Sequence, residues 1–214
     1  MFKKKKKEII QTGMKLDRYG LIALSGGNVS LRIENNIILM TPSGMIYEDL
    51  NVSDIVVMNL EGELLEGDRR PSVDNDAIRY IFDQRDDINA VIHTHQPYAT
   101  AIGLVDDTIE CNLTTLANAT RGSVKVAEYS SAASLEMGIQ AVKNLGEKLA
   151  VVLKHHGVIS VGKSLKEALY SAVYLEEAAK TLVMAEAYGR GKVESLTPEQ
   201  IRTAVDVFKD YGQK

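Results

Sequence analysis

The feature that most constrains this chain is the placement of its histidines. The sequence of 214 residues has four of them, and two, His93 and His95, follow the β-branched pair Val91 and Ile92. Such a run predicts a buried strand. Residues two apart on a strand point to the same face, so both imidazoles are expected to leave from one side. The sequence therefore predicts that two ligands for one metal ion lie at this strand end.

The other two histidines are adjacent, at positions 155 and 156, and follow the apolar run 149–153. Neighbouring residues of a strand face opposite sides, so only one of this pair is expected to join the first two. Three imidazoles from two strand ends form a donor set typical of zinc sites. The alternative is a set of hydrogen-bonded core or surface histidines. The same-face pair together with a second cluster favours the metal site.

Composition narrows the classes of protein to which the chain can belong. Its length suffices for one substantial α/β core, and its net charge of −4 gives no general attraction to nucleic acid. The single cysteine, Cys111, excludes an intrachain disulfide framework and is expected to be a small buried hydrophobe. No apolar run approaches the roughly 18 residues that a membrane helix requires, and no secretory signal follows the first residues. We expect a cytoplasmic protein with neither a membrane nor a nucleic-acid partner.

Five consecutive lysines at positions 3–7 can indicate binding to a membrane or a nucleic acid. They lead directly into residues 8–16, which continue as a helical pattern, so we interpret the lysines as a solvated face of the first helix. The side chains expected to form its buried side are Phe2, Ile9, Ile10 and Met14.

The rest of the pattern predicts strands and helices without a repeat or a linker. Further strands are expected at 28–33, 37–40, 55–59, 63–66, 124–127, 149–153 and 157–162. Further helices are expected at 75–85, 98–105, from 131 or 134 to 145, 165–188 and 197–208. Asp74 is a good N-cap for the helix that follows it, and Thr197 with Gln200 forms a capping pattern. We interpret residues 1–214 as one α/β domain, a mixed and mainly antiparallel sheet between layers of helices.

Three further motifs complete a resemblance to a known family. They are Asn28 on its strand, the loop Thr41-Pro42-Ser43-Gly44 and the loop Pro71-Ser72-Val73-Asp74. With the two histidine clusters, they make the chain similar to a class II aldolase of the aldolase/adducin superfamily. That group includes L-fuculose-1-phosphate aldolase and L-ribulose-5-phosphate 4-epimerase. The resemblance runs from the first helix to Tyr211 and implies the family's three-layer fold.

The resemblance also implies a metal and a phosphate site. His93, His95 and His156 would hold one Zn²⁺ per subunit, with His156 favoured over its neighbour because the family's ligand directly precedes the glycine. The substrate phosphate would be bound through backbone amides and hydroxyls. The residues at the matching positions are Asn28, Ser43, Gly44 and Ser72.

Two further residues gain roles from the resemblance. Asp74 matches the acidic residue that ligates the free metal and then acts as the base on the carbon next to the carbonyl, while zinc stabilises the enediolate. Its alternative is the capping role. Tyr211 matches a C-terminal tyrosine that enters a neighbouring subunit's site, and the implied assembly is a homotetramer with active sites between subunits; its alternative is surface packing at a helix end.

The chain departs from both named enzymes. Fuculose aldolase has Glu at the position of Asp74, Ser at the position of Val73 and a tyrosine acid near the position of Thr114. The epimerase has Asp at the position of Asp74, but it has a Lys at the position of Thr41 and a catalytic Asp near the position of Asn118. This chain therefore lacks two groups of the epimerase, the Lys and the catalytic Asp, that belong to the chemistry itself. The pattern favours a zinc-dependent aldolase that cleaves a phosphorylated ketose, similar to L-fuculose 1-phosphate or a related deoxy-sugar 1-phosphate, to dihydroxyacetone phosphate and an aldehyde. The alternatives are the 4-epimerase and, from another class, a non-catalytic adducin-like interaction domain.

Overall fold

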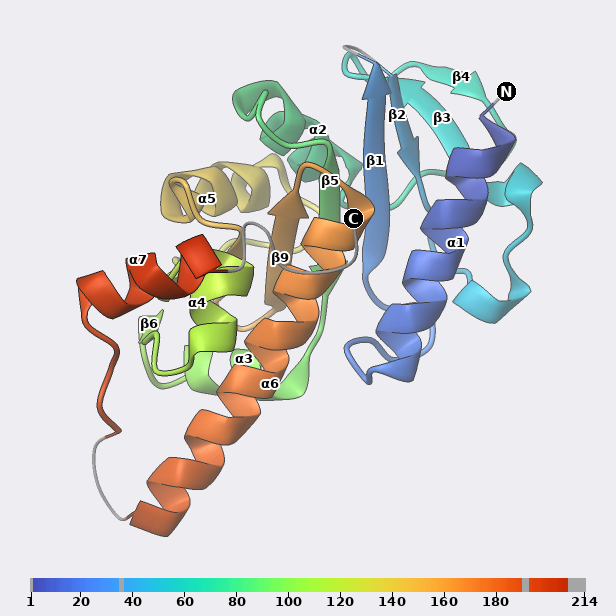
Figure 1. Ribbon diagram of the computed structural model, residues 1–214. Helices are drawn as coiled ribbons and strands as arrows, with labels where there is room; N and C mark the ends of the chain where they lie inside the picture. The colour runs from blue at the N-terminus through green and yellow to red at the C-terminus, as the bar shows by residue number, and fades with distance from the viewer. Residues whose placement is uncertain (1, 35–36, 190–192, 208–214) are drawn as a thin grey trace.

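The computed structural model describes residues 2–34, 37–189 and 193–207, and its centre is a mixed sheet (Figure 1). The strands are β1 Asn28–Glu34, β2 Ile37–Met40, β3 Val56–Asn59, β4 Leu64–Glu66, β5 Ala90–Thr94, β6 Thr108–Ile109, β7 Val124–Ala127, β8 Ala150–Leu153 and β9 Gly157–Gly162. Within the described residues they pair in the order β4-β3-β2-β1-β5-β9-β8-β7-β6. Of these pairs, β7 with β8 is parallel and the rest are antiparallel. The predicted mixed, mainly antiparallel α/β fold is confirmed.

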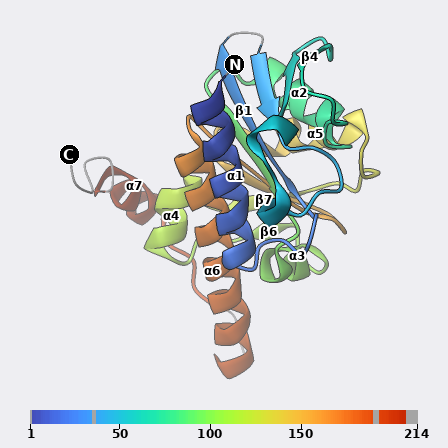
Figure 2. The same cartoon turned by 90° about the vertical axis from the view of Figure 1, so that its right-hand side faces the viewer.

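Helices cover both faces of the sheet. They are α1 Lys3–Arg18, α2 Asn75–Gln84, α3 Pro97–Gly103, α4 Thr114–Thr120, α5 Leu135–Leu145, α6 Leu165–Gly189 and α7 Pro198–Val207, with short 3-10 turns at Tyr47–Asp49 and Val52–Asp54. Helices α2 and α5 pack on one face, and α1, α3, α4 and α6 pack on the other. Figure 2 shows α1 and α6 along the same side of the molecule, with the lower end of α6 extending beyond the rest.

The strand that carries the first histidine cluster is buried on both faces. Val91 of β5 packs in the layer of α2 and α5, whereas Ala90 and Ile92 pack in the layer of α1 and α6. This explains why the sequence shows a continuous apolar run here instead of an alternating one. Alternation along the strand places His93 on the same side as Val91, toward the start of α2.

Helix α1 corrects one expectation about the basic run. Lys6 is only 1% exposed, and its ammonium lies 2.9 Å from a carboxylate oxygen of Glu66 in β4, whereas the other four lysines are exposed. Met14, expected to be buried, is 44% exposed. The buried stripe follows positions 6, 9, 12, 13 and 16, so a lysine occupies its first position. Its aliphatic stem covers apolar surface while the amine reaches a carboxylate.

Two elements are absent from the sequence prediction, α4 and β6. Helix α4 is short and rich in threonine, its N-cap residue Leu113 makes no capping hydrogen bond, and it ends at Arg121 with a φ of 66° instead of at a glycine. Leu116 and Ala117 pack in one cluster with residues of α6 and α7. Tertiary packing therefore stabilises a helix that local signals do not reveal.

Other local expectations agree with the structure. The Ser134 hydroxyl accepts a hydrogen bond from the Met137 amide, and Thr197 and Gln200 bond reciprocally at 2.8 and 3.2 Å. Cys111 is buried, and burial raises the pKa of its thiol to about 11.

In the part of the chain that the structure describes, no helix combines the length and the apolar character needed to cross a membrane.

Candidate metal centre and active site

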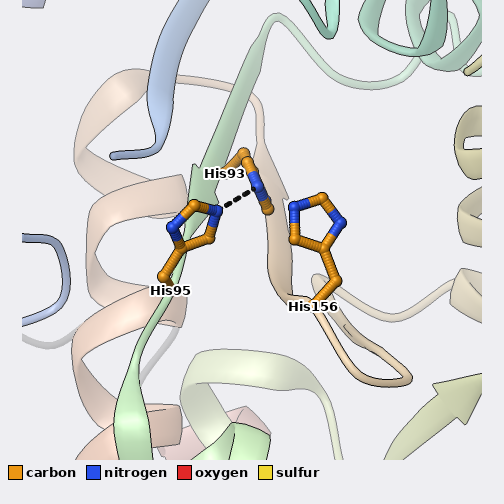
Figure 3. Close-up of side chains that lie close together, drawn as sticks. All are labelled: His93, His95 and His156. Atoms are coloured by element: carbon orange, nitrogen blue, oxygen red, sulfur yellow. Dashed lines mark hydrogen bonds between the residues drawn. The ribbon is translucent and has the colours of Figure 1, made fainter. Parts of the chain in front are cut away.

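Three of the four histidines come together at one end of the sheet (Figure 3). His93 lies at the end of β5, His95 follows that strand, and His156 belongs to the turn between β8 and β9. The ring centroids are 4.7, 4.7 and 5.2 Å apart, and one nitrogen of each ring lies within 4.8 Å of the others. His93 is buried, His156 is half-buried and His95 is exposed. The predicted convergence of the two clusters is thus present in the structure.

The hydrogen bonds of His93 fix its tautomer. Its Nδ1 lies 2.9 Å from the Val158 carbonyl oxygen, which can only accept, so Nδ1 carries the proton and Nε2 keeps its lone pair. Metal-binding histidines are commonly oriented by such a bond. The Nε2 atoms of His93 and His95 are 3.0 Å apart. Two ligands of a tetrahedral zinc ion would be separated by about 3.3 Å, so the two rings already stand close to a ligand geometry.

The electrostatics of the three rings favour a cation. Burial lowers the pKa of His93 to about 3, and the neighbouring rings of His156 and His95 act in the same direction. Burial also lowers the pKa values of His95 and His156, and the Asp74 carboxylate opposes that effect in both. All three imidazoles are therefore neutral near neutral pH, which is the protonation state that binds a metal.

A turn, and not strand alternation as expected, points the side chains of His155 and His156 in different directions. Residues 154–156 form a turn, not a strand end, and His155 has a left-handed φ of 60°. The exposed ring of His155 contacts Tyr129 at a centroid distance of 6.2 Å, while His156 faces the other two rings. The argument from strand alternation was wrong in its premise, although the structure does bring a single member of the pair to the cluster.

Two glycines allow other segments to approach the histidine strand. A Cβ at Gly157 would lie 2.2 Å from the Thr94 carbonyl oxygen, and a Cβ at Gly27 would lie 2.5 Å from that of His93. Gly27 also has a φ of +74°, which favours glycine. Side chains at either position would push the neighbouring segment off the end of β5. The glycine that follows His156 thus has a packing role of its own.

The carboxylate of Asp74 lies beside this cluster. It is 6% exposed, and its Oδ2 accepts a hydrogen bond of 2.9 Å from Asn28 Nδ2. Asn28 pairs with His93 across β1 and β5, so both residues belong to the face on which α2 begins. Asp74 is the N-cap residue of α2, yet among the described residues its side chain bonds no helix N–H. The capping alternative does not account for the orientation of this carboxylate.

The two loops that carry the other expected phosphate residues pair with each other. Pro42 and Pro71 form an antiparallel bridge; the Ser43 amide donates to the Arg70 carbonyl at 3.0 Å, and the Ser72 amide donates to the Thr41 carbonyl at 3.2 Å. These two amides are therefore already bonded to carbonyl oxygens.

The groups that remain for an anion are fewer. They are the Ser43 hydroxyl, the Gly44 amide and the Ser72 hydroxyl, whose oxygen accepts a bond from the Asp74 amide at 3.3 Å. The loop residues lie next to the Asn28–Asp74 pair, so the structure joins most of the predicted site residues into one region. Tyr211, the remaining predicted site residue, lies outside the described residues.

A buried polar network behind the histidines was not predicted. The Thr94 hydroxyl donates to Gln96 Oε1 at 2.7 Å, and Gln96 Nε2 donates to the Ala172 carbonyl of α6 at 3.3 Å. The two carboxylate oxygens of Glu176 accept from the Tyr98 and Ala99 amides at 2.8 and 3.0 Å. Burial raises the pKa of Glu176. The available signal was the one acidic interruption in the otherwise apolar stripe of α6.

Replacing Glu176 with alanine is expected to lower the free energy of unfolding by about 1–3 kcal/mol, because two amides at the start of α3 lose their acceptor. Zinc binding should weaken as well, since the segment after His95 keeps its Gln96–Ala172 bond to α6 but loses the two bonds to Glu176. Urea unfolding and a zinc titration measure the two effects. Glu177→Ala, an exposed neighbour on the same helix, is the control and should change neither. Wild-type stability in Glu176→Ala would contradict this role.

Comparisons with known proteins agree with the geometry. The family model for the class II aldolase and adducin N-terminal domain matches residues 7–183. A 5-deoxy-D-ribulose 1-phosphate aldolase from Bacillus thuringiensis serovar kurstaki is 30% identical over 215 residues and covers 100% of both chains. An L-ribulose-5-phosphate 4-epimerase from Salmonella paratyphi C is 31% identical over 189 residues, 83% of each.

A solved structure of an L-fuculose 1-phosphate aldolase superposes on this fold with a TM-score of 0.90 and 31% identity, and the match covers 95% of each chain. The likeness therefore extends over the sheet, both helical layers and the end of the sheet that carries the histidines. On the evidence of the family model and of relatives that align along its whole length, the chain belongs to the class II aldolase and adducin family.

Proposed function

We propose that this protein is a zinc-dependent aldolase that cleaves a phosphorylated ketose to dihydroxyacetone phosphate and an aldehyde. The observation that carries the proposal is the meeting of three neutral imidazoles with one buried carboxylate, Asp74, at a single end of the sheet. A cation site beside a base is what carbon–carbon bond cleavage next to a carbonyl requires. The similarity to aldolases named for deoxyribulose and fuculose 1-phosphates supports the same substrate class.

The donor set of His93, His95 and His156 fits a zinc ion. His93 presents the lone pair of Nε2, and three nitrogen ligands leave a coordination position for substrate oxygens. A bound zinc ion supplies Lewis-acid stabilisation of the negative charge that develops on the substrate's carbonyl oxygen.

Asp74 is assigned the proton transfer at carbon. In the cleavage direction the hydroxyl of the carbon that leaves as aldehyde gives its proton, through water, to the Asp74 carboxylate, and the electrons of the broken carbon–carbon bond move toward the carbonyl oxygen. The carbon next to the carbonyl then takes this proton from Asp74, and in the reverse direction the Asp74 carboxylate removes it. The Asn28 amide holds the carboxylate at 2.9 Å in this orientation. The second amide atom, Asn28 Oδ1, is buried without a partner among the described residues and can accept from a substrate hydroxyl.

The substrate phosphate is placed at the paired loops. The Ser43 and Ser72 hydroxyls and the Gly44 amide are the donors that the loop pairing leaves there, and the second N–H of Asn28 Nδ2 completes the set. By its likeness to the family we further propose a cytoplasmic homotetramer in which Tyr211 completes a neighbouring subunit's site.

A second candidate is the 4-epimerase reaction, which uses the same cleavage and then re-adds the aldehyde on its other face. Two observations favour it: the acidic residue is Asp74, as in that enzyme, and an epimerase is 31% identical over 189 residues.

The deciding experiment is a screen of zinc-loaded protein against ketose 1-phosphates, scored by release of dihydroxyacetone phosphate, beside L-ribulose 5-phosphate scored by formation of D-xylulose 5-phosphate. Turnover of a ketose 1-phosphate that stops on chelation and returns with zinc supports the aldolase. Efficient epimerisation without net cleavage would replace it with the second candidate. A purified protein that holds no zinc and binds none when it is added would support the non-catalytic interaction domain.

A further inference from the structure

The loop pairing at the proposed phosphate site also sets which residue stands opposite Arg70. The bridge between Pro42 and Pro71 is flanked by the Ser43–Arg70 bond and by the Ser72–Thr41 bond, which is an antiparallel pattern. Ser43 therefore stands opposite Arg70, and opposite residues in such a pair project to the same face with Cβ atoms about 5 Å apart.

The loop pair is bonded to the two elements that carry Asn28 and Asp74. Alternate residues of a pair share a face, so Thr41 and Ser72 lie on the same face of the loop pair as Ser43 and Arg70. The Thr41 hydroxyl accepts a bond from the Val29 amide at 3.2 Å, and the Ser72 hydroxyl accepts from the Asp74 amide at 3.3 Å. These bonds hold the loop pair against β1 and the start of α2, beside Asn28 and Asp74. Arg70 leaves from the same face, beside the exposed Ser43.

The two neighbouring arginines differ in their engagement. Arg69 Nε bonds Asp54 Oδ1 at 2.8 Å and belongs to the structural support of the loop. The guanidinium of Arg70 is exposed, and within the described ranges it has neither an ion pair nor a hydrogen bond. Arg70 is therefore free to turn toward a ligand bound at Ser43 and Gly44. A guanidinium matches two phosphate oxygens at once, and a lysine cannot reproduce that geometry.

The same loop pairing removes neutral donors from the site, because the Ser43 and Ser72 amides are bonded to carbonyl oxygens. A phosphate monoester carries close to two negative charges at neutral pH, and few donors remain to balance them. We propose that Arg70 binds the phosphate of the substrate and makes the site selective for the phosphorylated sugar over the free sugar. This inference rests on the proposed function and adds to it the residue that sets the charge preference.

The test uses zinc-loaded protein and glycerol 3-phosphate, a phosphate monoester that has no carbonyl group and therefore cannot undergo aldol cleavage. Calorimetric titration compares wild type with Arg70→Met, Arg70→Lys and Arg69→Met. We expect Arg70→Met to bind about tenfold more weakly, as for the loss of one charge-assisted contact at a partly exposed site. Arg70→Lys should recover part of the affinity. Arg69→Met should keep the wild-type affinity even if loss of the Asp54 pair lowers its melting temperature.

The salt dependence gives a second readout that a structural role would not change. Affinity of the wild type should fall more steeply with sodium chloride than affinity of Arg70→Met, because one charge contact is screened in the first and absent in the second. Equal affinity and equal salt dependence in the two proteins would overturn the role of Arg70 and leave the aldolase proposal standing. If the wild type does not bind glycerol 3-phosphate at all, the phosphate site itself is wrong, and the proposed function fails with it.

Discussion

Replacing His95 with alanine is expected to abolish both the bound zinc and the catalytic activity. Two imidazoles cannot hold the ion in a three-nitrogen geometry, and we expect zinc affinity to fall by more than about a hundredfold, beyond the effect of changing a residue that only orients a ligand. His95 is exposed and lies after the end of β5, so the core should fold normally. Metal content after dialysis, measured by mass spectrometry, and circular dichroism test the two halves of this prediction.

The matched control for this variant is His155→Ala. His155 adjoins a proposed ligand, is exposed and contacts Tyr129 instead of the other rings. It should keep one zinc ion per chain and nearly full turnover. If His95→Ala instead retained its zinc and its turnover, the assignment of the three-histidine site would have to be abandoned.

Asp74→Asn is expected to keep the zinc ion and lose most of the proton transfer. The substituted side chain has the same shape and can still accept the bond from Asn28. A neutral amide, however, is not basic enough to remove a proton from the carbon next to the carbonyl. Loss of one general base reduces rates by about 10²–10⁴-fold. In deuterated water, the hydrogen next to the carbonyl of dihydroxyacetone phosphate exchanges with solvent, and NMR monitors the rate of this exchange. With no aldehyde in the mixture, the exchange measures the proton transfer alone.

Asp76→Asn controls for the loss of a charge at the start of α2. Asp76 is an exposed residue of the first turn, paired with Arg79 at 2.5 Å. Its replacement should leave the exchange rate unchanged, with a small effect on stability at most. Exchange at the wild-type rate in Asp74→Asn would reduce Asp74 to a residue at a helix terminus.

The parts of the fold that follow from local signals were predictable. The apolar run into His93, the capping pair at Thr197 and Gln200 and the stripe of α6 each depend on residues within one or two turns of one another. The strands and most helices appear where these patterns place them. The convergence of His156 on the first cluster was also predictable in outline, because each cluster lies at or just after the end of a buried strand.

Other features depend on partners that are distant in sequence. Lys6 is buried because its ammonium forms an ion pair with Glu66. The Asp74 carboxylate turns away from its helix because it accepts a hydrogen bond from Asn28, which lies 46 positions earlier in the sequence. No local pattern specifies either contact. Helix α4 is similar, since α6 and α7 supply the apolar surface that stabilises it. The bonds that occupy the Ser43 and Ser72 amides likewise appear only when the two loops meet.

The double-sided burial of β5 has a consequence for how this protein tolerates change. Two of the three proposed cation ligands, His93 and His95, lie at the end of this buried strand, whereas Ser43, Gly44 and Arg70 of the paired loops are exposed. Substitutions in these exposed loop positions can therefore change how tightly a phosphate is bound without displacing the ligands of the ion. Affinity for the substrate and possession of the metal are in this way separable properties of the chain.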